Sequence, residues 1–247
     1  MAAMLLLALF WPAPSRAGDE EVARAVQLLD QGEKSLDIAS LNAALAIFLK
    51  ECQGPVRNSL CEYYIARVYL AQSSYYSRVK DDSSAANQAL AQAEASGKEA
   101  ILRRPNDPAV HVLMGKVLQV KLMRFPISSI TVAMISTSPV ITEYQRALEL
   151  DPNNGPAELG LGIYYQFIPR LIGGDGHRAR GHFRRAAELM PADPEPLVWT
   201  AISCRQEGRL GEAREALDRA LALDPDDKFA RAEDLRLRAA EKAQGGR

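Results

Sequence analysis

The chain has 247 residues, of which 47% are hydrophobic and 25% are charged, and its formal net charge is −1. This composition is typical of a soluble globular protein. The near-zero net charge gives no reason to expect binding to nucleic acid or to an anionic bilayer.

The N-terminus has the features of an export signal. An apolar run at residues 4–11 is too short to span a bilayer as a helix. A small-x-small triplet at residues 15–17 follows and predicts cleavage before Gly18. No Lys or Arg precedes the apolar run, so a wrongly assigned start or a cytosolic N-terminal segment stays open as the alternative. We expect a signal peptide over residues 1–17 and a periplasmic or secreted protein that is not an integral membrane protein.

Residues 19–54 are predicted to form a divergent pair of helices. Cys52 and Cys61 flank the turn at residues 53–58, near the facing ends of two antiparallel helices. In an oxidising compartment these two cysteines could form a disulfide, although the sequence does not give their geometry. Cys204 is predicted to be buried.

A pattern of four residues occurs four times at identical spacing. Steps of four, three and five residues place a small, a larger and a small side chain on one helix face, with a proline beyond the helix end. The upstream helices carry small residues, each fifteen positions after the second small residue of the preceding unit: Ala66, Gly115, Gly162 and Ala201. This spacing predicts an array of helix pairs, which usually forms a binding surface. The pattern residues are Ala93, Gly97, Ala100 and Pro105; Val140, Tyr144, Ala147 and Pro152; Ala179, Phe183, Ala186 and Pro191; and Ala213, Leu217, Ala220 and Pro225.

The unit at residues 157–191 resembles the tetratricopeptide repeat (TPR). It has Leu161-Gly162 and Tyr165 on its first helix, and the Ala-x-x-x-Phe-x-x-Ala pattern with a closing proline on its second. The resemblance covers about residues 58–240 and implies an all-α, right-handed TPR-like solenoid. We predict about five helix pairs, a polar capping helix over residues 228–242 and a disordered tail over residues 241–247.

The units differ in length between their first and second helices. From the small residue of the first helix to that of the second, the spacings are 34, 32, 24 and 19 residues (66→100, 115→147, 162→186, 201→220). Inserts at equivalent places in stacked repeats project from the same edge of a solenoid. The first insert, near residues 73–84, is rich in Ser and Tyr and is predicted to lengthen the helices around it.

The second and third inserts are apolar and lie next to each other in the array. Two neighbouring apolar loops are not expected to be fully exposed to solvent. They either pack on each other and on the helix ends, or form a hydrophobic pocket or a partner-docking edge, and the two arrangements can coexist. The candidate binding residues of this edge are Phe125, Ile127, Ile130, Phe167 and Ile168.

The third insert carries an Ile-Pro-x-Leu-x-Gly-Gly-Asp segment at residues 168–175. This segment is similar to one found in a broad group of exported bacterial TPR proteins. Together with the export signal, it is also similar to the T-component of tripartite ATP-independent periplasmic (TRAP) transporters. That resemblance implies an accessory protein that handles a solute for a transporter.

The first helices offer a second candidate surface, on the concave side of the predicted solenoid. Tyr63 and Ile163 belong to its apolar floor, and Arg67, Lys116 and Arg205 lie along it. Cations above an apolar floor suit an extended peptide or an amphiphilic acid, because they meet carboxylates. The alternative is that these are ordinary exposed positions with solvated cations.

The sequence gives little support for phosphate binding, metal binding or catalysis. The Gly-rich turn at residues 173–176 lacks the ending of a P-loop, so Asp175 is predicted to cap a helix. His177 and His182 do not share a helix face as metal ligands would, and Arg180 is predicted to lie on a solvated face. No catalytic residue, cofactor or metal is predicted. The leading hypothesis is a non-catalytic periplasmic scaffold for a protein or peptide partner. The alternative is an accessory protein that binds a small hydrophobic acid.

Overall fold

The computed structural model describes residues 16–51, 60–124 and 138–245, and every regular element among them is a helix. The chain divides into two compact units, Met1–Arg103 and Arg104–Arg247. The boundary falls after the second helix pair, within the region that the sequence predicts as one solenoid. Among the described residues, five helix pairs are followed by a single helix, so the predicted all-α fold is confirmed.

The first unit contains two helix pairs: α1 (Arg16–Ser35) with α2 (Ile38–Glu51), and α3 (Cys61–Arg78) with α4 (Ser83–Arg103). Helix α1 begins inside the predicted signal segment. The Asp37 side chain accepts hydrogen bonds from the backbone N–H groups of Ala39 and Ser40 at 3.1 and 3.2 Å, which caps α2. The first insert is part of the long helices α3 and α4, as the sequence predicts, and Asp82 caps α4.

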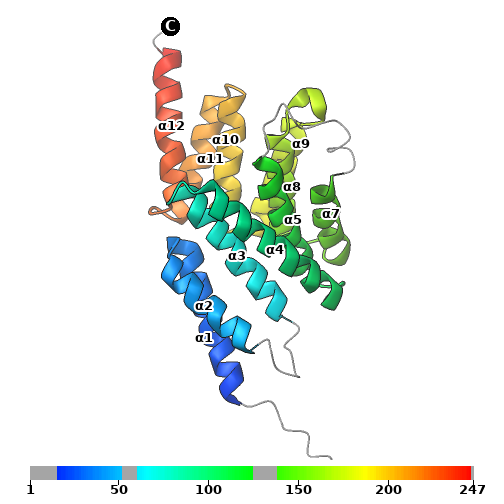
Figure 1. The fold of residues 1–247 in the computed structure, drawn as a ribbon. Helices are drawn as coiled ribbons and strands as arrows, with labels where there is room; N and C mark the ends of the chain where they lie inside the picture. Colours follow the sequence, from blue (N-terminus) through cyan, green and yellow to red (C-terminus); the bar gives the residue numbers. More distant parts are fainter. Residues whose placement is uncertain (1–15, 52–59, 125–137, 246–247) are drawn as a thin grey trace, which may run out of the picture. The chain divides into compact units, whose positions relative to one another are not determined.

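The second unit contains three helix pairs and the last helix (Figure 1). The first helices of the pairs pack on the second ones, and α10 also packs on α8, α9 and α12. A short 3-10 helix, η2, lies between α8 and α9. The bounds are α5 (Pro108–Met123), α7 (Pro139–Leu150), α8 (Gly155–Phe167), η2 (Arg170–Ile172), α9 (Gly176–Leu189), α10 (Glu195–Gln206), α11 (Leu210–Leu223) and α12 (Lys228–Gly245).

The same proline turn precedes each of the first helices of this unit and α12. The backbone N–H of the fourth turn residue donates to the carbonyl of the first, at 3.1–3.2 Å, and proline presets φ at the second position. The side chain of the fourth residue then accepts a hydrogen bond from the N–H of a residue in the next helix. The turns therefore end one helix pair and start the next. The residues that occupy the fourth position are Asp107, Asn154, Asp193 and Asp227.

The repeated pattern forms the core. All of its helical members are buried, and Tyr144, Phe183 and Leu217 have no exposed surface at all. Burying each of these large side chains stabilises the fold by about 1.5–3 kcal/mol. Gly115 lies against the Tyr144 ring and Gly162 against the Phe183 ring, so the paired helices approach each other closely at these two glycines.

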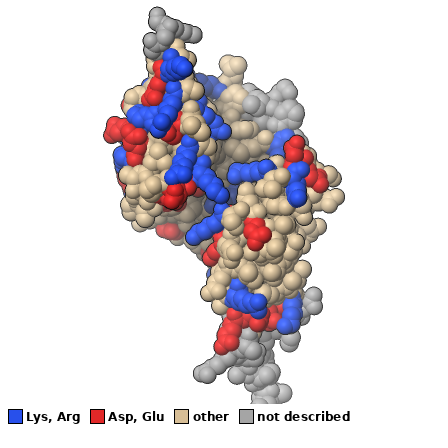
Figure 2. Space-filling view, turned by 90° about the vertical axis from the view of Figure 1, so that its left-hand side faces the viewer, with Lys and Arg blue, Asp and Glu red and all other residues tan. Residues whose placement is uncertain are grey.

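Charged side chains hold α12 to the rest of its unit. Arg205 of α10 pairs with Glu233, which is only 1% exposed, and Arg214 of α11 pairs with Asp234 and Glu241. Figure 2 shows basic and acidic side chains interspersed near the C-terminal end, at the top of the view. Helix α12 continues to Gly245, so the predicted disordered tail from residue 241 is wrong over residues 241–245. The reason is that Glu241 is tied to Arg214.

Acidification is expected to loosen α12 before the rest of the unit. Burial opposes the charge of Asp234, but Arg214 and Arg238 together lower the pKa of its carboxyl; Arg214 also lowers the pKa of Glu241. Because both pKa values are lower in the folded state, their stabilising effect is complete above the ordinary values of 3.8 and 4.5 and is lost as the pH falls further. Amide NMR signals of α12 should disappear first during an acid titration. Loss of the α8 signals at a higher pH would contradict this.

The three cysteines differ in state and surroundings. Cys61, at the start of α3, is disulfide-bonded, whereas its predicted partner Cys52 lies outside the described residues. The predicted burial of Cys204 is confirmed, and its thiol is free. Burial also raises the pKa of the Cys204 thiol.

We expect only slow alkylation of Cys204 in the folded protein, because the reactive thiolate is both scarce and shielded. Mass spectrometry after iodoacetamide treatment should find Cys204 modified only once denaturant is added. Rapid modification in the native protein would show that α10 opens readily.

Candidate functional site

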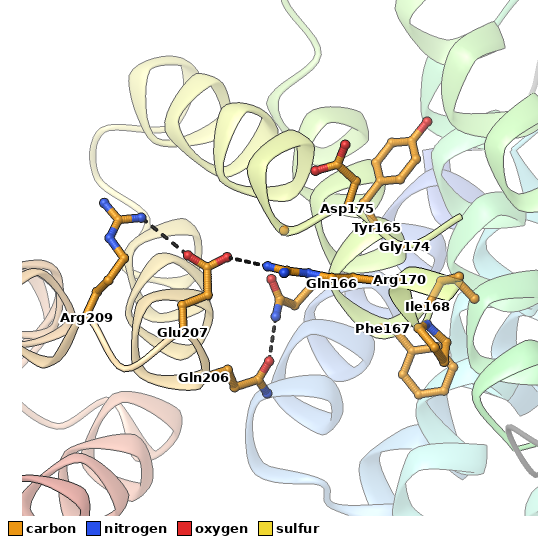
Figure 3. A pocket seen from close by; sticks show the side chains of 12 residues that line it. Tyr165, Gln166, Phe167, Ile168, Arg170, Gly174, Asp175, Gln206, Glu207 and Arg209 are labelled. Atoms are coloured by element: carbon orange, nitrogen blue, oxygen red, sulfur yellow. Dashed lines mark hydrogen bonds and ion pairs between the residues drawn. The ribbon is translucent and has the colours of Figure 1, made fainter. Parts of the chain in front are cut away.

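A hollow of about 560 Å³ opens at the edge of the second unit where first helices turn into second helices. The end of α8, the η2 loop, the start of α9 and the end of α10 line it (Figure 3). This is the edge at which the sequence predicts projecting inserts, and we call the hollow the loop-edge pocket. Its lining residues are Tyr165, Gln166, Phe167, Ile168, Pro169, Arg170, Gly174, Asp175, Gly176, Gln206, Glu207 and Arg209.

Local chain geometry shapes the wall made by the third insert. Pro169 disfavours helical backbone at the residue before it, and Ile168 is extended, with ψ 132°, so α8 ends at Phe167. Gly173 has φ 106°, in the left-handed region that favours glycine. A Cβ on Gly174 would collide with the carbonyl of Ile168, so only glycine fits there. The backbone thereby folds back onto the end of α8.

Asp175 fixes the start of α9 at the rim of the pocket. Its carboxylate accepts hydrogen bonds from the N–H groups of His177 and Arg178, at 2.9 and 3.1 Å. The bond from Arg178, the larger cause, and that from His177 both lower the pKa of the Asp175 carboxyl. The predicted capping role of Asp175 is therefore confirmed.

Three arginines surround one carboxylate at the pocket. Glu207 pairs with Arg180, lies 3.5 Å from Arg209 and lies 3.6 Å from Arg170. Burial opposes the charge of Glu207, but Arg180 and Arg209 together lower the pKa of its carboxyl. Arg209 also pairs with Glu212, so the three arginines face two carboxylates. The Arg170 side chain is 79% exposed and is therefore accessible to an incoming anion.

The predicted solvated position of Arg180 is wrong, because its guanidinium turns toward Glu207 and is mostly buried.

Two glutamine amides hydrogen-bond to each other beside this cluster (Figure 3). The Gln166 side-chain N–H donates to Gln206 Oε1 at 2.5 Å. The remaining amide oxygen of Gln166 is buried and has no hydrogen-bond partner within the described part of the chain. An unpaired buried oxygen costs free energy unless a donor reaches it. The pocket can therefore offer cations, an amide acceptor and an apolar wall to one small molecule or one side chain.

Only part of the predicted apolar edge lies within the described residues. Phe167 and Ile168 line the loop-edge pocket, with Ile168 itself buried against the core of the unit. Phe125, Ile127 and Ile130 lie outside the described residues. Ile168 therefore contributes to packing as well as to the pocket wall, so both predicted arrangements meet at this residue.

The concave-side candidates occupy different settings. In the first unit, Arg67 pairs with Glu33 at 2.6 Å and Asp30 at 2.9 Å, and its guanidinium lies over the Tyr63 ring. In the second unit, Lys116 of α5 is exposed. Two further residues lie on other helices of that unit: Ile163 of α8 packs partly buried against the core, and Arg205 of α10 pairs with Glu233. A partner carboxylate would have to compete with these internal pairs at both arginines.

Several pocket residues were not predicted, although the repeat period contains a signal for them. The last two complete units are 34 residues apart (186→220). The same step leads from Asp175 to Arg209, which both line the pocket, and from Gly173, next to the pocket residue Gly174, to Glu207. Aligning the turns of successive units would have placed these charges beside the third insert. Among the described residues, no group of His, Cys, Asp and Glu could hold a metal ion.

A sequence model of one protein family matches residues 66–232, which is well over half of the chain. The family is described as the TRAP transporter T-component, TAtT. The chain belongs to this family. The match begins at Ala66 on α3 and ends within α12, so it includes the whole loop-edge pocket.

Solved structures show the same fold as this family member. One is a thermophilic TPR protein, TTC0263 of Thermus thermophilus, at 20% identity and a TM-score of 0.67, covering 90% of this chain and 98% of that one. Another is PilW, described as a type IV pilus biogenesis factor, at 19% identity and a TM-score of 0.64, covering 94% and 88%. The TPR resemblance is thereby confirmed. No curated protein matches the chain in sequence.

Within residues 16–51, 60–124 and 138–245, no helix is both long enough and apolar enough to cross a bilayer.

Proposed function

We propose that this protein is a non-catalytic periplasmic scaffold that binds a protein or peptide partner of a TRAP transport system. The observation that carries the proposal is the family match over an array of TPR helix pairs. Each helix buries one stripe in the core and leaves the rest of its surface for contacts, which is how repeat arrays present extended binding faces. The export signal predicted at residues 1–17 supports a periplasmic location.

Partner binding is tested by affinity capture from envelope extracts of the native cells. We expect one protein to co-purify in a fixed ratio and to be released by salt, because salt screens contacts between exposed charges. N-terminal sequencing of the same preparation should give a mature protein that begins near Gly18. Recovery of intact Met1 from the cytosol would contradict the location, and absence of any stoichiometric partner would contradict the scaffold.

The loop-edge pocket favours a second candidate function, an accessory protein that binds a small hydrophobic acid. Its volume of about 560 Å³ lies in the range of small-molecule sites. Phe167 and Ile168 supply an apolar wall, and the exposed Arg170 supplies charge for a carboxylate.

Decanoic acid is a suitable probe for this second function, with decanol as the matched compound that lacks the carboxylate. We expect the acid alone to raise the melting temperature, because a ligand at 100 times its Kd stabilises by about 2.7 kcal/mol. Arg170→Glu should remove the shift, and Arg185→Glu, outside the pocket, should keep it. Equal shifts with acid and alcohol would exclude carboxylate recognition here.

A further inference from the structure

A second hollowed surface of the protein lies next to the loop-edge pocket, with which it shares Arg209, where α9 and α11 flank α10. One hollow of about 500 Å³ has both helices as walls, and a smaller one of about 280 Å³ continues it. The two hollows share Ala187, Leu197 and Arg219, so they form one depression. We call this depression the α9–α11 groove.

The first part of the groove has more arginines than carboxylates: Arg180, Arg184, Arg209 and Arg219 line it, together with Glu188 and Glu212. Arg184 of α9 and Arg219 of α11 are exposed, line the groove and make no ion pair within the described ranges of the chain. Neighbouring arginines are occupied: Arg180 pairs with Glu207, and Arg209 pairs with Glu212. Two cations without internal partners therefore face the same depression from opposite walls. Charge complementarity favours an occupant that brings carboxylates.

The second part of the groove is mostly apolar, and Asp193 lies at its lining as well. Met190, Pro191 and Leu223 line it, and Leu223 is 45% exposed. Between the two parts, Ala187 and Ala216 are too small to fill the space above α10. The groove thus changes from basic to apolar along its length.

The dimensions fit a short peptide segment. The lining residues run from Arg180 to Pro191 along one wall and from Glu212 to Leu223 along the other. At 1.5 Å per helical residue, each wall is about 15 Å long. This length equals about three turns of a helix or about five extended residues. A helix laid into a groove presents apolar and charged residues at such spacings.

We propose that the α9–α11 groove binds an acidic, amphipathic segment of a partner protein, with carboxylates on Arg184 and Arg219 and apolar side chains beside Leu223. The proposal rests on the scaffold function above and names the surface and the chemistry of the contact. Its two cations lie on the second helices α9 and α11, whereas the sequence placed its concave-side candidates on first helices.

Site-specific photo-crosslinking in the native cells tests the assignment. A benzophenone amino acid replaces Glu188 in the basic part, Ala222 in the apolar part, or Arg170 at the loop-edge pocket; all three positions are exposed. The crosslinked peptide is sequenced by mass spectrometry. The same measurement is repeated in an Arg184→Glu/Arg219→Glu background. The matched control is Arg78→Glu/Lys80→Glu, which makes the same change in net charge on exposed residues of the first unit.

We expect positions 188 and 222 to crosslink to one segment of another protein that contains Asp or Glu beside apolar residues. Charge reversal at residues 184 and 219 should reduce the yield by at least about tenfold, and the control by less than about twofold. The proposal would be overturned by a crosslink to lipid, to a second copy of this chain or to a segment without acidic residues. It would also be overturned if the crosslinking yield stayed the same after the charge reversal. A partner captured only from position 170 would overturn this inference and leave the scaffold standing. If no protein crosslinks at any of the three positions, both this inference and the scaffold function are wrong.

Discussion

Gly162→Leu is expected to destabilise the second unit by about 3 kcal/mol, at the upper end of the range for overpacked cores. A Cβ at this position would lie 2.5 Å from two ring atoms of Phe183 and 3.2 Å from the carbonyl oxygen of Ala179. The ring cannot retreat, because Phe183 is completely buried and also stacks on Trp199. Thermal unfolding followed by circular dichroism should show a melting temperature lower by about 10 °C.

Gly181→Leu is the matched control, because Gly181 lies on α9, the partner helix of α8. A Cβ there would meet nothing within 4 Å. Leucine has a higher helix propensity than glycine, so this variant should be as stable as the wild type or more stable by about 0.5–1 kcal/mol. Similar losses of stability from both substitutions would mean that the buried and exposed faces of the α8–α9 pair are misassigned.

The helix faces could be predicted from sequence because TPR packing repeats in the residue pattern. Ala179, Phe183 and Ala186 occur at helical spacing, and the same pattern at Ala213, Leu217 and Ala220 lies 34 residues later (179→213). A spacing that recurs at this period has one simple physical cause, which is one helix face buried in successive pairs. The structure buries all six of these side chains completely.

The candidate sites could not be predicted in the same way, because they depend on contacts between turns and on the pairing of charges. Composition alone marks the third insert as apolar, yet the pocket beside it is completed by Glu207 and Arg209 from the next unit. Likewise, the repeat pattern singles out Arg205 as a concave-side cation and does not single out Arg184. Only the fold shows that Glu233 reaches Arg205 and that no acidic side chain in the described residues pairs with Arg184.

Arg205→Leu is expected to destabilise the second unit by about 3 kcal/mol, because it removes one partner of a buried ion pair. Glu233 is almost completely enclosed, and its remaining partner, Arg236, has a side chain that is 59% exposed. Without Arg205, the buried Glu233 carboxylate keeps only the exposed Arg236 as a partner, unless α12 separates from α10 and lets water reach it. Urea denaturation should give a lower midpoint, and hydrogen exchange should accelerate first in α12.

Two companion variants separate this ion pair from the surface charges around it. Arg205→Leu/Glu233→Leu should recover stability to within about 1 kcal/mol of the wild type, since replacing both members of a buried pair by apolar residues is often neutral. Arg236→Leu should cost less than about 1 kcal/mol, as expected for a solvent-exposed pair.

If Arg205→Leu keeps full stability but loses the captured partner, Arg205 is a binding cation, as the concave-side pattern in the sequence predicts. If it loses stability while the double variant binds normally, the positive charge at residue 205 serves the attachment of α12, and the binding surface lies elsewhere on the unit.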